Sequence, residues 1–423
     1  MRLNRDLDVV KNRQSQTDPA IIATVEKILA DVRTGGDEAL RNYARELDGF
    51  TGEDLMVSGK ELTHAMDSVG HEFTKLLARA EERITEFHKN QVQSSWSMYT
   101  NNGAITGQIL RPLERVAVYV PGGTAAYPSS VLMNCIPAML AGVKEIAIFT
   151  PVKADGKVHA AILAAVVACD IFSVYKVGGA HAIAAAAYGT ASIPKFDKIV
   201  GPGNIYVATA KRLVYGEVDI DMVAGPSEIL IIADKTANPK YIAADMMSQA
   251  EHDPLASSIL LSTSEQLIVE TQAEIRRQVA SMSRKDIILE SLQNHGAAIY
   301  VKNLEEAFEI SNDLAPEHLE ILTADPISHL PKVQNAGSIF LGEYTPEPLG
   351  DYMSGTNHVL PTGGTAKFYS GLGVYDFVKY SSYSYYPKGA LAELKDDVIT
   401  FAEAEGLDAH ANAVKTRFEE EHP

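Results

Sequence analysis

Side chains that could bind a metal or transfer protons occur in four short stretches of the sequence. The first is the end of a predicted helix at 238–251, where Gln249 and His252 are three residues apart and point within about a quarter turn of each other. A metal could bridge them, but a histidine near a helix C-terminus more often caps the helix or interacts with its dipole. The spacing leaves both interpretations open.

The second stretch, 315–320, carries a Glu-His pair after a proline. Glu317 could supply a carboxylate and His318 a base that titrates near neutrality. Without further context, the pair also fits ordinary polarity at a turn.

The third stretch, 349–358, contains Asp351 and is dense in glycine and polar residues, as in a functional loop or a plain turn. The fourth, 405–410, opens the last predicted helix with Glu405 and His410; by itself His410 would be a surface histidine. Together the stretches offer nitrogen and oxygen ligands without a thiolate pair, which suits zinc and, less well, manganese.

The elements that must position these residues form an α/β pattern. After helical segments at 18–95, short apolar strands alternate with helices; the strands are predicted at 116–120, 145–149, 173–177, 198–200, 228–234, 257–261 and 298–301. Such alternation is typical of a parallel sheet covered on both faces. We therefore predict two α/β units, at about 115–227 and 228–370. A tail follows, with a tyrosine-rich stretch at 380–386 that fits a subunit interface or an edge strand.

Four predicted strand ends carry Gly or Gly-Pro turns, at 121–123, 178–179, 201–203 and 225–226. Ligands of open α/β sheets bind at the carboxyl ends of strands, where glycine lets a phosphate approach the backbone. A nucleotide is therefore plausible. The complete G-x-G-x-x-G and G-x-x-x-x-G-K-[ST] motifs are both missing, so ordinary tight turns remain the alternative.

Composition excludes several classes of function. With 37 Lys plus Arg against 55 Asp plus Glu, the net charge is −18, which disfavours sequence-independent nucleic-acid binding and anionic membranes. Two cysteines, Cys135 and Cys169, rule out a disulfide framework and a Cys-rich zinc site. No apolar run is long enough to span a membrane and no secretory signal is evident, so a cytoplasmic enzyme is expected.

Taken together, the motifs resemble those of the histidinol dehydrogenase family, in family order and over essentially the whole chain. The matching stretches are 119–123, 177–180, 187–190, 197–207, 221–229, 248–253, 315–320, 354–362 and 405–410. The resemblance implies oxidation of L-histidinol to L-histidine through L-histidinaldehyde, with two NAD and one zinc per subunit, as the last step of histidine biosynthesis.

The resemblance also implies an architecture. Two incomplete Rossmann-like domains of aldehyde-dehydrogenase-like fold are expected, with small terminal segments exchanged in a homodimer. The expected boundaries are an N-terminal arm at 1–17, a domain of 18–114 plus 228–372 with most zinc and acid/base residues, a cofactor domain at 115–227 and a partner-packing tail at 373–423.

Matched position by position, the implied site residues fall into four groups. The zinc ligands are Gln249, His252, Asp351 and, from the partner chain, His410. The acid/base pair is Glu317 and His318. The substrate contacts are Ser227, His318 and Glu405 together with the zinc ligands. The NAD contacts are Tyr119, Asn204 and His181, where the family usually has glutamine; both side chains can hydrogen-bond, so NAD binding is expected to survive.

Three alternatives are kept. An aldehyde dehydrogenase-like enzyme would use Cys135 or Cys169 as nucleophile, although both cysteines fall in apolar helix patterns. A related dehydrogenase would oxidise another polar alcohol. A non-catalytic zinc module would not need Glu317 and His318.

Overall fold

The computed structural model describes residues 2–3, 18–50, 52, 54–122, 126–152 and 155–419, in two compact units. The first unit comprises residues up to Val92 and Leu113–Phe377, and the second Gln93–Pro112 with the chain from Val378 on. The predicted arm at 1–17 lies outside the described residues, except that Arg2–Leu3 form β1. Among the described helices, none is long and apolar enough to cross a membrane.

The first sheet of the larger unit is parallel, in the order β6-β5-β4-β7-β8. Its strands are β4 (Arg115–Tyr119), β5 (Glu145–Phe149), β6 (Ser173–Tyr175), β7 (Lys198–Val200) and β8 (Asp219–Ile220). Numbered along the chain, this is the order 3-2-1-4-5, a Rossmann sheet without its sixth strand. The order reverses between β4 and β7, which is where such sheets open a ligand crevice.

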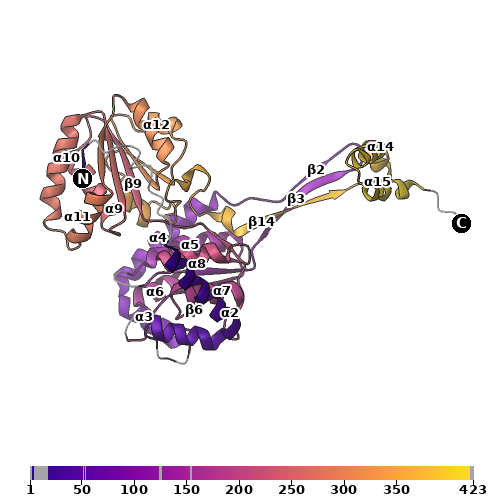
Figure 1. Ribbon diagram of the computed structural model, residues 1–423, viewed down its shortest axis with the longest axis horizontal. Helices are drawn as coiled ribbons and strands as arrows, with labels where there is room; N and C mark the ends of the chain where they lie inside the picture. The colour runs from indigo at the N-terminus through magenta and orange to yellow at the C-terminus, as the bar shows by residue number, and fades with distance from the viewer. Residues whose placement is uncertain are drawn as a thin grey trace. The chain divides into compact units, whose positions relative to one another are not determined.

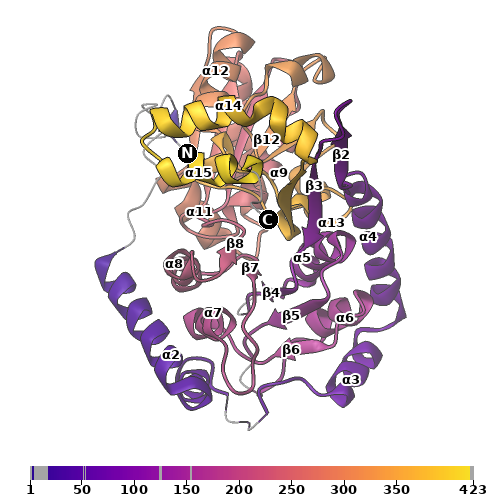
Figure 2. The ribbon, with the colours of Figure 1, turned by 90° about the vertical axis from the view of Figure 1, so that its right-hand side faces the viewer.

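Helices cover both faces of this sheet (Figure 2). One layer consists of α2 (Pro19–Leu47), α7 (Gly179–Tyr188) and α8 (Ile205–Val214). The other consists of α3 (Gly59–Val69), α4 (His71–Lys89), α5 (Pro128–Ala141) and α6 (Ala160–Ala168). The prediction that residues 18–114 accompany 228–372 is therefore wrong, because the apolar faces of α2, α3 and α4 are buried against helices of the 115–227 domain.

The second sheet has the order β1-β11-β10-β9-β12-β13, also entirely parallel. Its strands after β1 are β9 (Glu228–Ala233), β10 (Ser257–Ser262), β11 (Ala297–Tyr300), β12 (His318–Leu322) and β13 (Ser338–Leu341). They repeat the order 3-2-1-4-5. The helices that accompany this sheet are α9 (Pro239–Ala250), α10 (Glu265–Val279), α11 (Lys285–Asn294), α12 (Leu304–Leu314) and α13 (Glu347–Tyr352). The predicted α/β fold class with two parallel Rossmann-like sheets is confirmed.

Three of the four glycine turns lie at the carboxyl ends of strands, after β4, β6 and β7. The turn at 225–226 instead leads into the amino end of β9. That prediction is wrong, because β8 ends at Ile220 and does not reach the turn.

The second unit combines an antiparallel sheet, in the order β14-β3-β2, with two helices. Its elements are β2 (Trp96–Tyr99), β3 (Ile105–Pro112), β14 (Val378–Tyr385), α14 (Lys388–Ala404) and α15 (Asp408–Lys415), all labelled in Figure 1. The tyrosine-rich stretch is thus an edge strand, β14. The tail expected at 373–423 begins at Val378 and also includes residues 93–112, because β3 pairs with all of β14.

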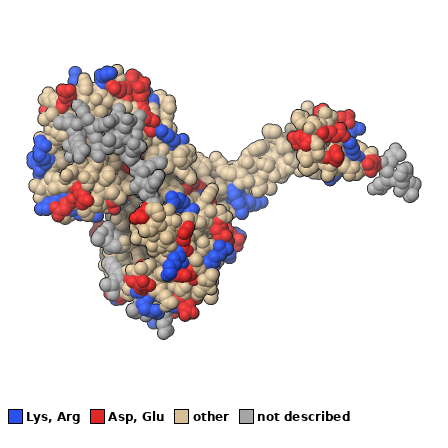
Figure 3. Space-filling model, viewed as in Figure 1, with Lys and Arg blue, Asp and Glu red and all other residues tan. Residues whose placement is uncertain are grey.

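Charge is distributed without strong segregation. On the face shown in Figure 3, acidic and basic side chains are interspersed over the described surface of each unit. The net charge of −18 is therefore not concentrated into one patch on that face.

Candidate active site

The predicted acid/base pair lies at the amino end of β12, beside the first residue of β9. The N–H of Glu228 donates to Glu317 Oε2 at 2.8 Å. The carbonyl oxygen of Glu228 lies 2.9 Å from His318 Nδ1. Nδ1 can donate a proton to that carbonyl or accept one from the amide of Gln249, and the first tautomer leaves Nε2 as the proton acceptor. Parallel pairing of β9 with β12 thus orients both side chains of the pair.

Burial shifts the pKa values of both Glu317 and His318. Both side chains are buried. Loss of hydration raises the pKa of Glu317 well above its usual value, and the charges of Glu228, Asp351 and Glu347 raise it further. Loss of hydration lowers the pKa of His318 to about 4, so the imidazole is neutral at neutral pH and can accept a proton.

Gln249, in the last turn of α9, reaches the same point. Its Nε2 lies 2.7 Å from His318 Nδ1. Its Oε1 is buried and has no hydrogen-bond partner among the residues that the structure describes. A buried amide oxygen without a partner is costly unless another group binds it, and a metal ion is one such group.

Asp351 faces the same imidazole together with Glu347, which the sequence analysis missed. Both lie on α13, four residues apart and therefore on one helix face. Glu347 Oε1 is 3.7 Å from His318 Nε2. Ligand atoms of His318, Glu347 and Asp351 all lie within 4.8 Å of one another, the one such group of His, Cys, Asp or Glu found among the described residues. The i, i+4 spacing to Asp351 was the signal that could have identified Glu347.

Concentrated negative charge makes this cluster electrostatically unfavourable without a cation. Burial, followed by the charge of Asp351, raises the pKa of Glu347 to about 9. A divalent cation would reverse this shift by stabilising both carboxylates. The donor set of amide oxygen, carboxylates and imidazole therefore fits a metal ion.

His358 is a second residue that sequence reasoning missed. Its Nδ1 lies 3.1 Å from the carbonyl oxygen of Asp351, and its Nε2 lies 3.4 Å from Ser130 Oγ at the start of α5. His358 therefore connects the Asp351 segment to the helix layer of the first sheet. The signal in the sequence was the stretch 349–358, whose polar density was noted without singling out this histidine.

The remaining predicted ligands and substrate contacts differ in placement. His252 follows the end of α9, is exposed, and is close enough to His318 and His358 to influence their charge. Ser227 directly precedes β9, and its carbonyl oxygen accepts from the N–H of Ser257 at 2.9 Å. Both therefore lie at the amino edge of the second sheet, with the acid/base pair.

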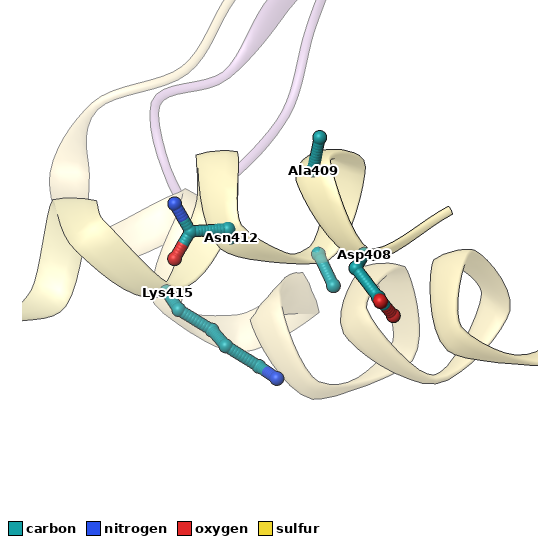
Figure 4. A pocket seen from close by; sticks show the side chains of 5 residues that line it. Asp408, Ala409, Asn412 and Lys415 are labelled. Carbon is teal, nitrogen blue, oxygen red and sulfur yellow. The ribbon is translucent and has the colours of Figure 1, made fainter. Parts of the chain in front are cut away.

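Glu405 and His410 belong to the second unit. Glu405 caps the C-terminus of α14, and His410 is exposed in the first turn of α15. A hollow beside α15 is lined by Asp408, Ala409, Ala411, Asn412 and Lys415 (Figure 4).

The predicted nucleotide residues Tyr119 and Asn204 lie at and just after the carboxyl ends of β4 and β7. Gly201, with φ +108°, passes so close to β4 that a Cβ there would lie 2.2 Å from the carbonyl oxygen of Tyr119. Asn204 caps α8, with Oδ1 accepting from the N–H groups of Tyr206 and Val207 at 3.1 Å each. The structure thus brings the turn at 201–203 beside Tyr119, at the point where the strand order reverses.

His181 lies in the first turn of α7 and is completely buried. Its Nε2 is 3.0 Å from Asp48 Oδ2. A side chain without exposed surface offers no atom to a ligand, so the predicted direct contact between His181 and NAD does not fit this placement.

Neither cysteine fits a nucleophile. Cys135 and Cys169 are free and buried, and burial raises the pKa of the Cys135 thiol well above its usual value, with the neighbouring Cys169 adding to the shift. Since the thiolate is the reactive form, the cysteine alternative loses its physical basis.

Two Rossmann-like sheets with a buried acid/base pair beside a metal-compatible cluster define an oxidoreductase of the dehydrogenase class. Comparison with known proteins gives the family. The family model of histidinol dehydrogenase matches residues 11–418, and the chain belongs to that family.

Curated relatives and a solved structure support this assignment. The chain is 59% identical over 421 residues to a histidinol dehydrogenase of Lactococcus lactis subsp. lactis, covering 99% of this chain and 98% of the relative. It is 54% identical over 409 residues to one of Clostridium acetobutylicum, covering 97% and 95%. The crystal structure of histidinol dehydrogenase from Elizabethkingia anophelis has a TM-score of 0.93 at 38% identity, covering 98% of this chain and 97% of that chain.

Proposed function

We propose that the protein oxidises L-histidinol to L-histidine in two steps, through a bound aldehyde, with two NAD and one zinc ion. The observation that carries the proposal is the burial of Glu317 and His318 against Glu228, beside the His318–Glu347–Asp351 cluster. Family membership supplies the substrate, and the site supplies chemistry suited to it. A dehydrogenase for another polar alcohol remains the second candidate.

Zinc would be held by Gln249, His252 and Asp351, with His410 contributed by the partner subunit. The free Oε1 of Gln249 and the unfavourable crowding of carboxylates support this set. The zinc ion would supply a template that orients the amine and imidazole of the substrate.

The residues of the chain would perform the proton transfers. His318 would accept the hydroxyl proton of the alcohol at Nε2 as the hydride leaves the hydroxyl-bearing carbon for a bound NAD. Glu317, in the ionised form that a bound cation would favour, would then accept a proton from the water that adds to the aldehyde, and the hydrated aldehyde would lose its second hydride to the second NAD. Burial of the pair keeps the reactive aldehyde from bulk water.

Counting the reduced cofactor tests the proposal. We expect about two NADH for each histidine formed from L-histidinol, as four-electron oxidation requires. NADH absorbance and amino-acid analysis of the same samples measure both products. Oxidation of another polar alcohol, without turnover of histidinol, would support the second candidate instead.

The second unit supports a homodimer. Exposed apolar residues on α14 recur at Leu394, Val398 and Phe401, a spacing that places them along one helix face. The buried residues of α14 and α15 are the alanines Ala390, Ala402 and Ala411, so this unit has little core of its own. Apolar surface of this kind is typical of an interface, and we propose that it packs on a partner subunit.

Subunit mixing tests the shared site. Glu317→Ala and His410→Ala would each be almost inactive alone. If His410 completes the partner's site, a mixed dimer contains one site with both residues intact, and mixing equal amounts should restore roughly a quarter of wild-type activity, assuming random exchange. Histidinol turnover before and after exchange measures this. Mixtures that stay inactive, although mass spectrometry shows exchanged dimers, would contradict the proposal.

A further inference from the structure

Asp48 and His181 form a hydrogen-bonded pair that packs against the Gly178–Gly179 turn, which leads from β6 into α7. Asp48 Oδ2 accepts from the N–H of Gly178 at 2.9 Å and lies 3.0 Å from His181 Nε2. Asp48 is itself the C-terminal cap of α2, where its N–H donates to the carbonyl oxygen of Ala44. One carboxylate oxygen thus joins the end of α2, the turn and the first turn of α7.

The ring of His181 also contacts the turn directly. A Cβ at Gly179, which has φ +59°, would lie 3.2 Å from both Cε1 and Nδ1 of the imidazole. Tyr43 stacks on the far side of the pair, with 6.0 Å between ring centroids. The imidazole is therefore enclosed by protein, with no exposed surface.

The same turn lies at the carboxyl edge of the first sheet, where ligands of this fold bind. The N–H of Gly179 donates to Tyr119 Oη at 3.0 Å, so the turn is tied to the end of β4. A Cβ at Gly178 or Gly122 would lie within 2.6 Å or 2.5 Å of Pro151, which follows β5. The loops after β4, β5 and β6 are thus packed against one another, and a shift of one would displace the others.

We infer that Asp48 and His181 are positioning residues for dinucleotide binding: the pair holds the Gly178–Gly179 turn, and through it Tyr119, without either side chain touching the dinucleotide. The inference rests on the proposed use of NAD. It also accounts for a histidine at a position where a direct contact was expected.

The test measures NADH affinity in the absence of histidinol, by fluorescence titration. We expect Asp48→Ala and His181→Leu each to weaken NADH binding roughly 10-fold, about the effect of losing one hydrogen bond to a charged group. Because both residues act through the same turn, the two losses should not add. The double variant should bind NADH as tightly as the single variant with the lower affinity. His181→Gln, whose amide can still donate to Asp48, should stay within about threefold of wild type.

Asp37→Ala is the matched control. Asp37 also lies on α2 and holds a loop, accepting from the N–H of Ser192 at 3.2 Å, but this loop follows the far end of α7. The Asp37→Ala substitution should lower the midpoint of thermal unfolding without changing the affinity for NADH. In the Asp48 and His181 variants, KM for NAD should rise while KM for histidinol and kcat stay within about twofold.

Each outcome is decisive. Additive losses in the double variant would show that His181 contacts the dinucleotide itself, and a lower unfolding midpoint with unchanged NADH affinity would show a purely structural pair. Either result overturns the inference and leaves the proposed function intact. Wild-type protein that binds no NADH would overturn both.

Discussion

Glu317→Gln is expected to lower kcat for histidinol oxidation by about 10²–10⁴-fold, the usual contribution of a positioned acid or base. Glutamine keeps the shape of the carboxyl group and can still accept from the N–H of Glu228, so the fold should persist. If Glu317 acts on the water that adds to the aldehyde, the first hydride transfer should survive the substitution. Rapid-quench experiments should then show one NADH per site formed quickly and the second formed slowly.

His318→Asn should differ, because His318 accepts the proton of the alcohol before either hydride transfer is complete. We expect both NADH equivalents to be lost together. Glu309→Gln, an exposed carboxylate on α12, is the matched control and should retain full activity. Equal loss of both equivalents in Glu317→Gln and His318→Asn would contradict the division of roles between the two residues.

Removal of the metal is expected to have the second large effect. A chelator should reduce turnover by more than about 100-fold and zinc should restore it, because the substrate would lose the group that orients it. Asp351→Asn and Gln249→Leu should each weaken zinc binding by at least about 100-fold. Loss of a residue that only hydrogen-bonds a metal ligand already lowers metal affinity by about 10- to 100-fold, and loss of the ligand itself should cost at least as much. Elemental analysis of dialysed protein measures zinc per chain independently of activity.

The same measurement distinguishes two ligand sets. Glu347→Gln should retain most of its zinc if Asp351 is the carboxylate ligand and Glu347 only supports it. Asp313→Asn, which removes an exposed carboxylate 3.4 Å from Lys367 Nζ, serves as control. Zinc lost from Glu347→Gln but kept by Asp351→Asn would show that Glu347, and not Asp351, is the ligand.

Local patterns in the sequence determined most of the elements. The apolar runs at 145–149, 198–200 and 228–234 are strands β5, β7 and β9 to within a residue, because strands covered on both faces are apolar throughout. The helix predicted at 238–251 is α9 to within a residue at each end, and the side chain of Asn238 caps its first turn. Chemically reactive residues were also visible as types and spacings, since Glu317-His318 is a local pair.

Only the tertiary structure decided what these residues do together. Gln249, His318 and Asp351 are far apart in the chain and meet because α9, β12 and α13 converge at the amino edge of one sheet. The elements on which α2, α3 and α4 pack were predicted wrongly. An amphipathic pattern shows that one face of a helix is buried, but it does not show which element covers that face. The same limit explains His181: its residue type suggested a ligand contact, whereas its burial against Asp48 depends on α2, 133 residues earlier in the chain.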